Sequence, residues 1–151
     1  MTAATAQAQT TVSHEARSND TAGMLAQMGD AVTTRASEEA EAIAAIERMR
    51  EMAADLRGCA ILAADGRVLA ASGDAERWGR AGAELLGAAD TARGEPAARV
   101  HVATADGEAF ALREGALAMV AVAERFTLAS LMMFDMRAVL RDLAAALEAG
   151  G

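Results

Sequence analysis

The residues best suited to covalent chemistry are one thiol and one histidine. Cys59 is the only cysteine of the 151-residue chain, and His101 is the only histidine after residue 14. A thiol nucleophile needs a base within hydrogen-bond reach, and both residues fall on predicted strands, so a Cys–His pair is one interpretation. The other, which we favour, is a small buried thiol and a histidine on an edge strand. One cysteine and two histidines, scattered along the chain, also lack the spacing of a zinc site.

The glycines do not form a phosphate-binding loop. The Gly-x4-Gly-Lys-Ser/Thr motif requires a lysine, and every basic residue of this chain is an arginine. Gly79, Gly82 and Gly87 lie within a predicted helix, whereas the glycines of a dinucleotide-binding loop follow a strand. The chain is therefore not itself a standard P-loop GTPase. We expect no catalytic residues, no cofactor and no metal.

A tryptophan between two arginines is the pattern most typical of a binding surface. Arg77, Trp78 and Arg80 lie together in a predicted helix, and tryptophan and arginine are enriched at the energetic hot spots of protein interfaces. A core tryptophan flanked by solvated arginines is the alternative. The sequence leaves both interpretations open.

Composition limits the partners that the chain can bind. The net charge is −8, which disfavours nucleic acid and anionic membrane surfaces. No apolar run approaches the roughly 18–20 residues of a membrane span, the N-terminus lacks a signal segment, and one cysteine cannot form an internal disulfide. We expect a cytoplasmic protein. Hydrophobic residues make up 53% of the chain but aromatic ones only 3%, so a core of small side chains favours additional burial against a partner subunit.

Two Ala-Asp-Gly segments between apolar runs predict two hairpins. The turns fall at Asp65-Gly66 and Asp106-Gly107, because a tight hairpin turn needs a positive φ that glycine adopts without steric cost. We expect the carboxylates at these turns, and the neighbouring Glu108, to be solvated rather than catalytic. The hairpins give an antiparallel arrangement of their strands.

The first part of the chain is predicted to be a flexible segment, residues 1–35, followed by a folded domain, residues 36–148. Residues 1–20 contain almost no large apolar residue and cannot offset the entropy of ordering. A short helix over 22–32 is the one candidate element there. A helix should then begin near Ser37 and end at Arg57-Gly58, with a basic last turn and a glycine after it.

Four further elements are indicated by patterning. A helix over 75–92, with Asp74 as its cap, should bury a stripe at Trp78, Ala81, Leu85 and Ala89. Residues 117–123 are apolar on both faces and predict a central strand, whereas residues 99–105 alternate and predict an edge. A last helix, capped by Thr127, should carry the apolar residues Leu128, Leu131, Met132, Val139, Leu140, Leu143 and Leu147.

The order of these elements resembles the Roadblock family, which includes a dynein light chain and bacterial MglB-type proteins. The resemblance covers residues 36–148 and rests on the run Leu56-Arg-Gly-Cys-Ala-Ile-Leu-Ala-Ala-Asp-Gly-Arg-Val-Leu-Ala-Ala-Ser72. It implies an α+β fold with a five-stranded antiparallel sheet in the order α-β-β-α-β-β-β-α. The first and last helices would cover one face and the middle helix the other.

The resemblance also implies a homodimer that extends the sheet through the middle helix and the third strand. An unpaired strand edge is itself a template for pairing, so residues 99–105 fit this role. We expect the dimer interface at Gly79, Gly82, Ala83, Leu86, Val100 and Val102.

The partner implied by the resemblance is a small Ras-like GTPase, bound by a regulator or adaptor that is not itself an enzyme. We place this binding at Arg77, Trp78 and Arg80. The alternative is a scaffold or tethering module in which the dimer serves self-assembly and residues 1–35 act as a docking peptide. A ligand-sensing domain is a third class, disfavoured for polar ligands by the apolar inward positions.

Overall fold

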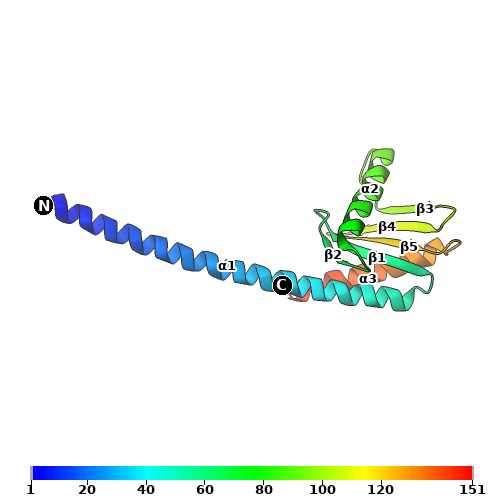
Figure 1. Ribbon diagram of the computed structural model, residues 1–151, viewed down its shortest axis with the longest axis horizontal. Helices are drawn as coiled ribbons and strands as arrows, with labels where there is room; N and C mark the ends of the chain where they lie inside the picture. Colours follow the sequence, from blue (N-terminus) through cyan, green and yellow to red (C-terminus); the bar gives the residue numbers. More distant parts are fainter. Residues whose placement is uncertain (1, 151) are drawn as a thin grey trace. The chain divides into compact units, whose positions relative to one another are not determined.

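Three helices and five strands follow one another in the order predicted, as the computed structural model of the chain shows (Figure 1). The structure describes the backbone of residues 2–150 and the side chains of residues 21–150. The helices are α1 (Thr2–Met52), α2 (Ala75–Arg93) and α3 (Ala129–Gly150). The strands are β1 (Leu56–Ala63), β2 (Val68–Ala71), β3 (Arg99–Ala103), β4 (Glu108–Glu114) and β5 (Leu117–Ala123).

The strands form one antiparallel sheet in the order β2-β1-β5-β4-β3. The all-apolar strand β5 lies in the middle, and the alternating strand β3 lies at an edge, paired only with β4. Both placements were predicted, because a strand apolar on both faces must be covered on both sides. The predicted α+β fold class is confirmed.

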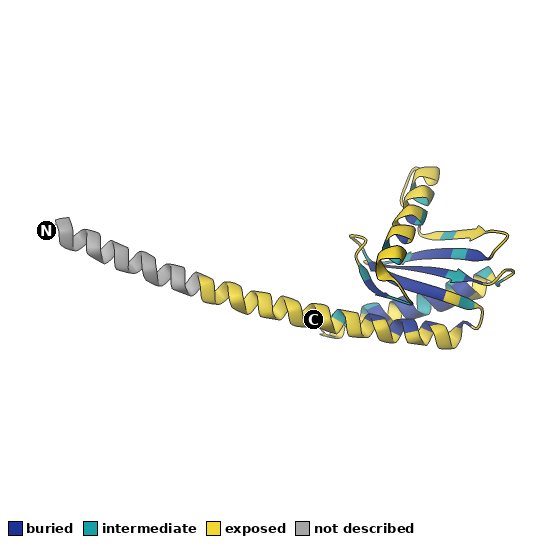
Figure 2. Ribbon diagram, in the orientation of Figure 1, coloured by how far each residue is buried: buried dark blue, intermediate teal, exposed yellow. Residues whose placement is uncertain are grey.

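The two faces of the sheet carry two separate cores. Residues 42–49 of α1, Ala53 just after it and the buried side of α3 pack against one face, around Phe110, Met119 and Ile61. Helix α2 covers the other face, where the smaller core consists of Leu62, Leu86, Ala111, Ala118 and Val120. The central strands are accordingly buried while β3 stays largely exposed (Figure 2). The arrangement of helices implied by the resemblance is therefore confirmed.

Both predicted hairpin turns are present, but their glycines serve different purposes. Gly66 has a φ of 90°, and its turn is closed by a hydrogen bond from the amide of Ala63 to the carbonyl of Arg67. Gly107 does not have a positive φ. A Cβ there would lie 2.7 Å from the carbonyl oxygen of Ala123, so this glycine is required by a close approach of two backbones.

Helix α1 differs from the prediction at both ends. It begins at Thr2 rather than near Ser37, because residues 2–36 contain no proline and nothing in this sequence stops the helix. It ends at Met52 rather than at Arg57-Gly58, because the chain from Leu56 onward pairs with β5. The chain divides at Ala36/Ser37 into two units. The flexibility of residues 1–35 stays a prediction.

The start of α3 also differs from the prediction. Thr127 does not cap the helix: its hydroxyl donates to the carbonyl of Glu124, and the first helical carbonyl is that of Leu128, which accepts from Met132. Of the apolar residues expected on this helix, Met132, Val139, Leu140 and Leu143 are buried, whereas Leu131 is exposed, as is Leu128 just before the helix. Among the described residues, no helix is both long enough and apolar enough to cross a membrane.

Candidate protein-binding site

The thiol and the histidine do not form a pair. Cys59 on β1 and His101 on β3 lie on the same face of the sheet, in one row across the strands. Ala121 of β5 and Phe110 of β4 lie between them in that row. Three strand spacings are about 14 Å, well beyond hydrogen-bond reach. Cys59 is fully buried, and burial raises the pKa of its thiol to about 12. The buried-thiol interpretation is therefore correct, and His101 cannot act as a base for the thiol of Cys59.

Glu108 has a structural role that the sequence did not reveal. Instead of being solvated at a turn, it is buried, and its two carboxylate oxygens have separate partners. Oε1 lies 2.7 Å from Nε2 of His101, and Oε2 accepts a hydrogen bond from the amide of Thr127 at 2.6 Å. The His101 ring stacks on Phe110. This carboxylate joins the edge hairpin to the loop before α3, and within the described residues no group of three or more potential metal ligands exists.

The indole of Trp78 closes one end of a groove on the α2 face of the sheet. Its Nε1 donates to the carbonyl of Ser72 at 2.9 Å, and its ring lies over Gly58 of β1. A Cβ at Gly58 would be 2.9 Å from both the Trp78 ring and the Ser72 hydroxyl, so only glycine fits beneath the indole. Asp74 caps α2 as predicted, accepting from the amides of Glu76 and Arg77, and so fixes the start of the helix that carries Trp78.

The groove around Trp78 has a volume of about 490 Å³ and a mixed apolar and cationic lining. Ala81 and Val122 supply its apolar part, while Arg57 and Arg77 stand at its sides. Arg57 already has a partner within the chain. Its guanidinium donates to the Glu124 carboxylate at 2.6 Å, and this hydrogen bond lowers the pKa of the Glu124 carboxyl. The Arg77 guanidinium, by contrast, has no hydrogen bond or ion pair with any described residue. Half-buried Trp78 and Arg77, which has no partner among the described residues, therefore lie together in the lining of one groove.

Arg80, the third residue predicted for partner binding, is exposed on α2 one turn after Arg77. Its guanidinium likewise has no partner among the described residues. The structure does not place Arg80 in the lining of the groove. It brings Arg77 and Trp78 together and leaves Arg80 beside them on the exposed surface.

The residues predicted for the dimer interface divide between two environments. Gly82 and Leu86 are buried, and a Cβ at Gly82 would lie 3.0 Å from Leu62 and 3.3 Å from Val120. Gly79 is equally close to the sheet, since its Cβ would lie 3.1 Å from Val68. These three positions let α2 approach its own sheet. The stripe expected to be buried, by contrast, leaves Ala81 exposed and Leu85 half-buried.

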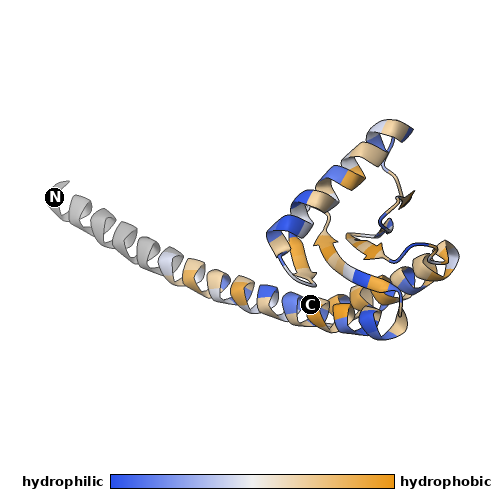
Figure 3. Ribbon diagram, turned by 45° about the vertical axis from the view of Figure 1, so that its right-hand side comes forward, coloured by the Kyte–Doolittle hydropathy of each residue, from blue (hydrophilic) through white to orange (hydrophobic). Residues whose placement is uncertain are grey.

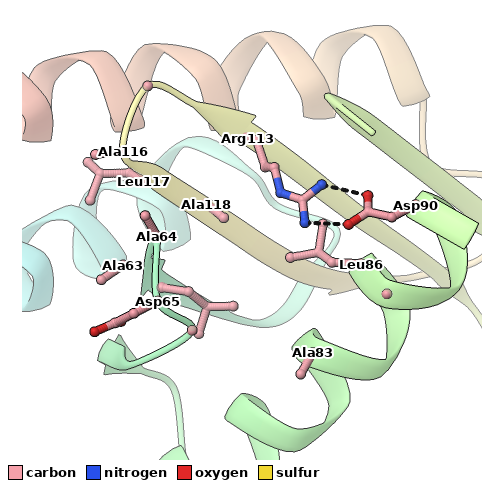
Figure 4. A pocket seen from close by; sticks show the side chains of 14 residues that line it. Ala63, Ala64, Asp65, Ala83, Leu86, Asp90, Arg113, Ala116, Leu117 and Ala118 are labelled. Carbon is pink, nitrogen blue, oxygen red and sulfur yellow. Dashed lines mark hydrogen bonds and ion pairs between the residues drawn. The ribbon is translucent and has the colours of Figure 1, made fainter. Parts of the chain in front are cut away.

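The remaining predicted interface positions are available to a partner. Ala83 is exposed beside a hollow of about 370 Å³ between α2 and the turns of the sheet (Figure 4). Val102 on the edge strand is 40% exposed, and Val100 packs incompletely against the α2-side core together with Leu85. Leu85, Val100 and Val102 therefore form a broken apolar surface between α2 and the open edge of β3.

An ion pair holds the end of α2 beside this edge. Arg113 of β4 contacts both carboxylate oxygens of Asp90, at 2.7 and 2.9 Å (Figure 4). Asp90 also accepts from the amide of Ala97, and the hydrogen bond from Arg113 is the main reason that the pKa of Asp90 is lowered to about 2. This ion pair, which we call the Asp90–Arg113 clamp, joins the end of α2 to β4, and the bond to Ala97 joins it to the loop that leads into β3.

Comparison with solved structures identifies the fold. The Roadblock/LC7 domain from Streptomyces avermitilis aligns with 69% of this chain and 95% of its own, with a TM-score of 0.58 and 16% identity. The gliding protein MglB from Thermus thermophilus aligns with 74% of this chain and 92% of its own, with a TM-score of 0.61 and 14% identity. A structure described as MglB with a tetrameric arrangement aligns with 74% of this chain and 91% of its own, with a TM-score of 0.56 and 12% identity. No protein-family model and no curated protein matches the sequence. The chain has the Roadblock/LC7 fold, as the resemblance predicted.

Proposed function

We propose that this Roadblock-fold chain is a non-enzymatic homodimeric adaptor that binds a small Ras-like GTPase and modulates its nucleotide cycle. The observation that carries the proposal is the groove at Trp78, where an incompletely buried indole lies next to an arginine with no partner among the described residues. Such a pair is typical of interface hot spots. The family resemblance implies the class of partner.

The dimer would be formed by the open side of the sheet. β3 is paired on one edge only, and an unpaired strand edge is a template for a second strand. The apolar surface of Leu85, Val100 and Val102 lies along the same edge. A second copy would continue the sheet through β3 and cover these side chains, with Ala83 at the margin.

A regulator without catalytic residues acts by binding one conformation of its partner better than another. A GTPase whose switch loops differ between nucleotide states would be shifted toward the state that fits the dimer. Arg77 and Arg80 would contribute charge complementary to acidic groups of that partner.

The direct test uses the full chain and a Ras-like GTPase encoded beside it. The affinity is measured by calorimetry with the GTPase loaded with GDP or with a non-hydrolysable GTP analogue, and GTP turnover is measured with and without the chain. We expect binding that prefers one nucleotide state. The variant Arg77→Glu/Arg80→Glu should weaken it at least about tenfold, whereas Arg35→Glu/Arg48→Glu, which changes two exposed arginines on α1, is the control with the same change of charge. Absence of binding in both nucleotide states would refute the proposal.

A scaffold function is the second candidate, and one observation favours it. In the described part of α1 before Ser37, four large apolar side chains are exposed: Met24, Leu25, Met28 and Val32. They recur among polar residues along the helix (Figure 3). Leu25, Met28 and Val32 have the 3–4 spacing of a helix-pairing seam, although the segment is too short to indicate a continuous coiled coil.

Sedimentation velocity distinguishes the two candidates. If the seam drives assembly, the full chain forms species larger than a dimer, and the variant Leu25→Ser/Met28→Ser reverts to the dimer. If the wild-type chain sediments as a dimer at all concentrations tested, the scaffold function is rejected.

A further inference from the structure

A largely buried aspartate, with no partner among the described residues, lies at the opposite side of the sheet from α2. Asp135, in the second turn of α3, is 8% exposed. Within the described residues no group donates a hydrogen bond to it or forms an ion pair with it. Burial raises the pKa of its carboxyl above the ordinary value. The oxygens of Asp135 are not among the fully buried side-chain atoms that lack a partner in the described residues, so the carboxylate reaches solvent and is free to accept a donor from a ligand.

Asp135 lines a small cavity between the end of α1 and the start of α3, which we call the acidic socket. Its volume is about 190 Å³. A second carboxylate, Asp55, and the hydroxyl-bearing Thr127 also line it. The socket has a rim of three apolar side chains, and all three are well exposed: Met52 (47%), Leu128 (65%) and Leu131 (55%).

The lining indicates what kind of group would fit. A metal ion is disfavoured, because the described residues contain no cluster of three or more metal-binding side chains, and an apolar rim does not suit a hydrated cation. An arginine side chain matches both the apolar rim and the carboxylates of the socket, because its alkyl stem lies along apolar surface while its planar guanidinium binds carboxylates. The net charge of −8 also favours a basic partner.

We propose that the acidic socket receives an arginine side chain from a partner protein, with apolar side chains of that partner covering the rim at Leu128 and Leu131. The inference goes beyond the proposed function, because the socket lies on the α1–α3 face and the groove at Trp78 on the α2 face. The socket would remain open in a dimer formed through α2 and β3. Loss of one site therefore leaves the other testable.

The test uses two short peptides that differ only in charge. The probes are acetyl-Leu-Arg-Leu-amide and its citrulline analogue, titrated into the ¹⁵N-labelled full chain and followed by NMR. We expect the arginine peptide to shift the amides of residues 52–55 and 127–135 and to bind at least about tenfold more tightly than the citrulline peptide, as for a charge-assisted hydrogen bond. Equal binding of the two peptides, shifts confined to other residues, or no binding would overturn the inference.

Two matched variants separate a binding role from a structural one. Asp135→Asn keeps the shape of the side chain and should remove the preference for arginine over citrulline. Asp142→Asn removes the same charge from an exposed position on the same helix and should leave the preference unchanged. Thermal unfolding of both variants provides the check on folding: Asp135→Asn should not be destabilised, because its carboxylate makes no bond to the described residues of the free chain. Retention of the preference in Asp135→Asn would refute the assignment.

Discussion

The close approach between α2 and β1 can be tested with a single methyl group. In Gly58→Ala the added Cβ would lie 2.9 Å from a ring carbon of Trp78 and 2.9 Å from the hydroxyl of Ser72. Neither neighbour is free to move. The indole donates to the carbonyl of Ser72, and the Ser72 hydroxyl both accepts from the amide of Cys59 and donates to its carbonyl. Relief of the contact therefore requires at least one of these bonds to break.

The expected cost combines two effects. Overpacking by one carbon costs about 1–3 kcal/mol, and loss of one such hydrogen bond costs about 0.5–1.5 kcal/mol. We therefore expect Gly58→Ala to lose about 2–3 kcal/mol of the free energy of unfolding, once partial relaxation is allowed for. For a folded unit of this size, the melting temperature should fall by about 3–6 °C per kcal/mol.

The assay has a built-in local reporter, because Trp78 is the only tryptophan of the chain. Chemical denaturation gives the free energy, and the native emission spectrum reports whether the indole has been displaced toward solvent. The matched control is Gly87→Ala on the exposed side of α2, where a Cβ meets nothing within 4 Å. It should stabilise the helix by about 0.5–1 kcal/mol. A Gly58→Ala variant with wild-type stability and wild-type emission would show that the packing of Trp78 over Gly58 is wrong.

Three further predictions concern the interface, the clamp and the thiol. Leu85→Asp should dissociate the proposed dimer in sedimentation experiments, while Thr91→Asp, at an exposed position on a different face of α2, should not; a Leu85→Asp variant that stays dimeric would contradict the proposed surface. Because the pKa of Asp90 is lowered from 3.8 to about 2, its pairing with Arg113 stabilises the fold above about pH 4, and this contribution is lost as the pH falls toward 2. The difference in urea midpoint between wild type and Arg113→Gln should accordingly be largest at pH 7 and shrink as the pH falls through about 2, leaving the effect of the hydrogen bond from Arg113 to the carbonyl of Ala97; a difference independent of pH would argue against the clamp. With a pKa of about 12, only about one Cys59 side chain in ten thousand is a thiolate at pH 8. Cys59 should therefore react with a disulfide reagent only on unfolding. Rapid reaction of the native chain would show that the thiol is accessible.

The sheet could be predicted from the sequence because its determinants are local. Two Asp-Gly turns, the doubly apolar run of β5 and the alternation in β3 each act within a few residues, and together they specify the hairpins and the central and edge positions. The start of α2 was predictable for the same reason, since Asp74 satisfies amides that are two and three residues away.

The faces of the helices were harder to predict, because alanine and glycine carry little information about burial. In α2 the buried row passes through Gly82 and Leu86, and the hydrophobic pattern alone selected the adjacent row through Ala81 and Leu85. A glycine is buried there to let the backbone approach Leu62 and Val120, and this reason is visible only once the sheet is present. Likewise, the end of α1 was misplaced because Gly58 was interpreted as a helix terminator, whereas it is needed beneath an indole twenty residues later.

The candidate sites likewise divide into residues that the local sequence indicates and residues whose role depends on the folded structure. Trp78 and Arg77 were selected from residue type alone, and they do meet in one groove. Asp135 could not be selected, since an aspartate inside an amphipathic helix is normally solvated, and its burial depends on the loop at the end of α1. The exposure of Leu128 and Leu131 could not be predicted for a related reason: in a helix rich in large apolar residues, periodicity offers more than one possible buried face.

The two proposed surfaces have opposite electrostatic character and lie on opposite faces of one sheet. Arg77 and Arg80 form a cationic area on an acidic chain, suited to an acidic partner, whereas the socket at Asp135 is suited to a basic one. A single partner surface of one charge cannot satisfy both, so they are best explained as sites for different ligands. Since the edge of β3 belongs to neither, a dimer formed there would carry two copies of each. In such a dimer each ligand could bind without covering the site of the other.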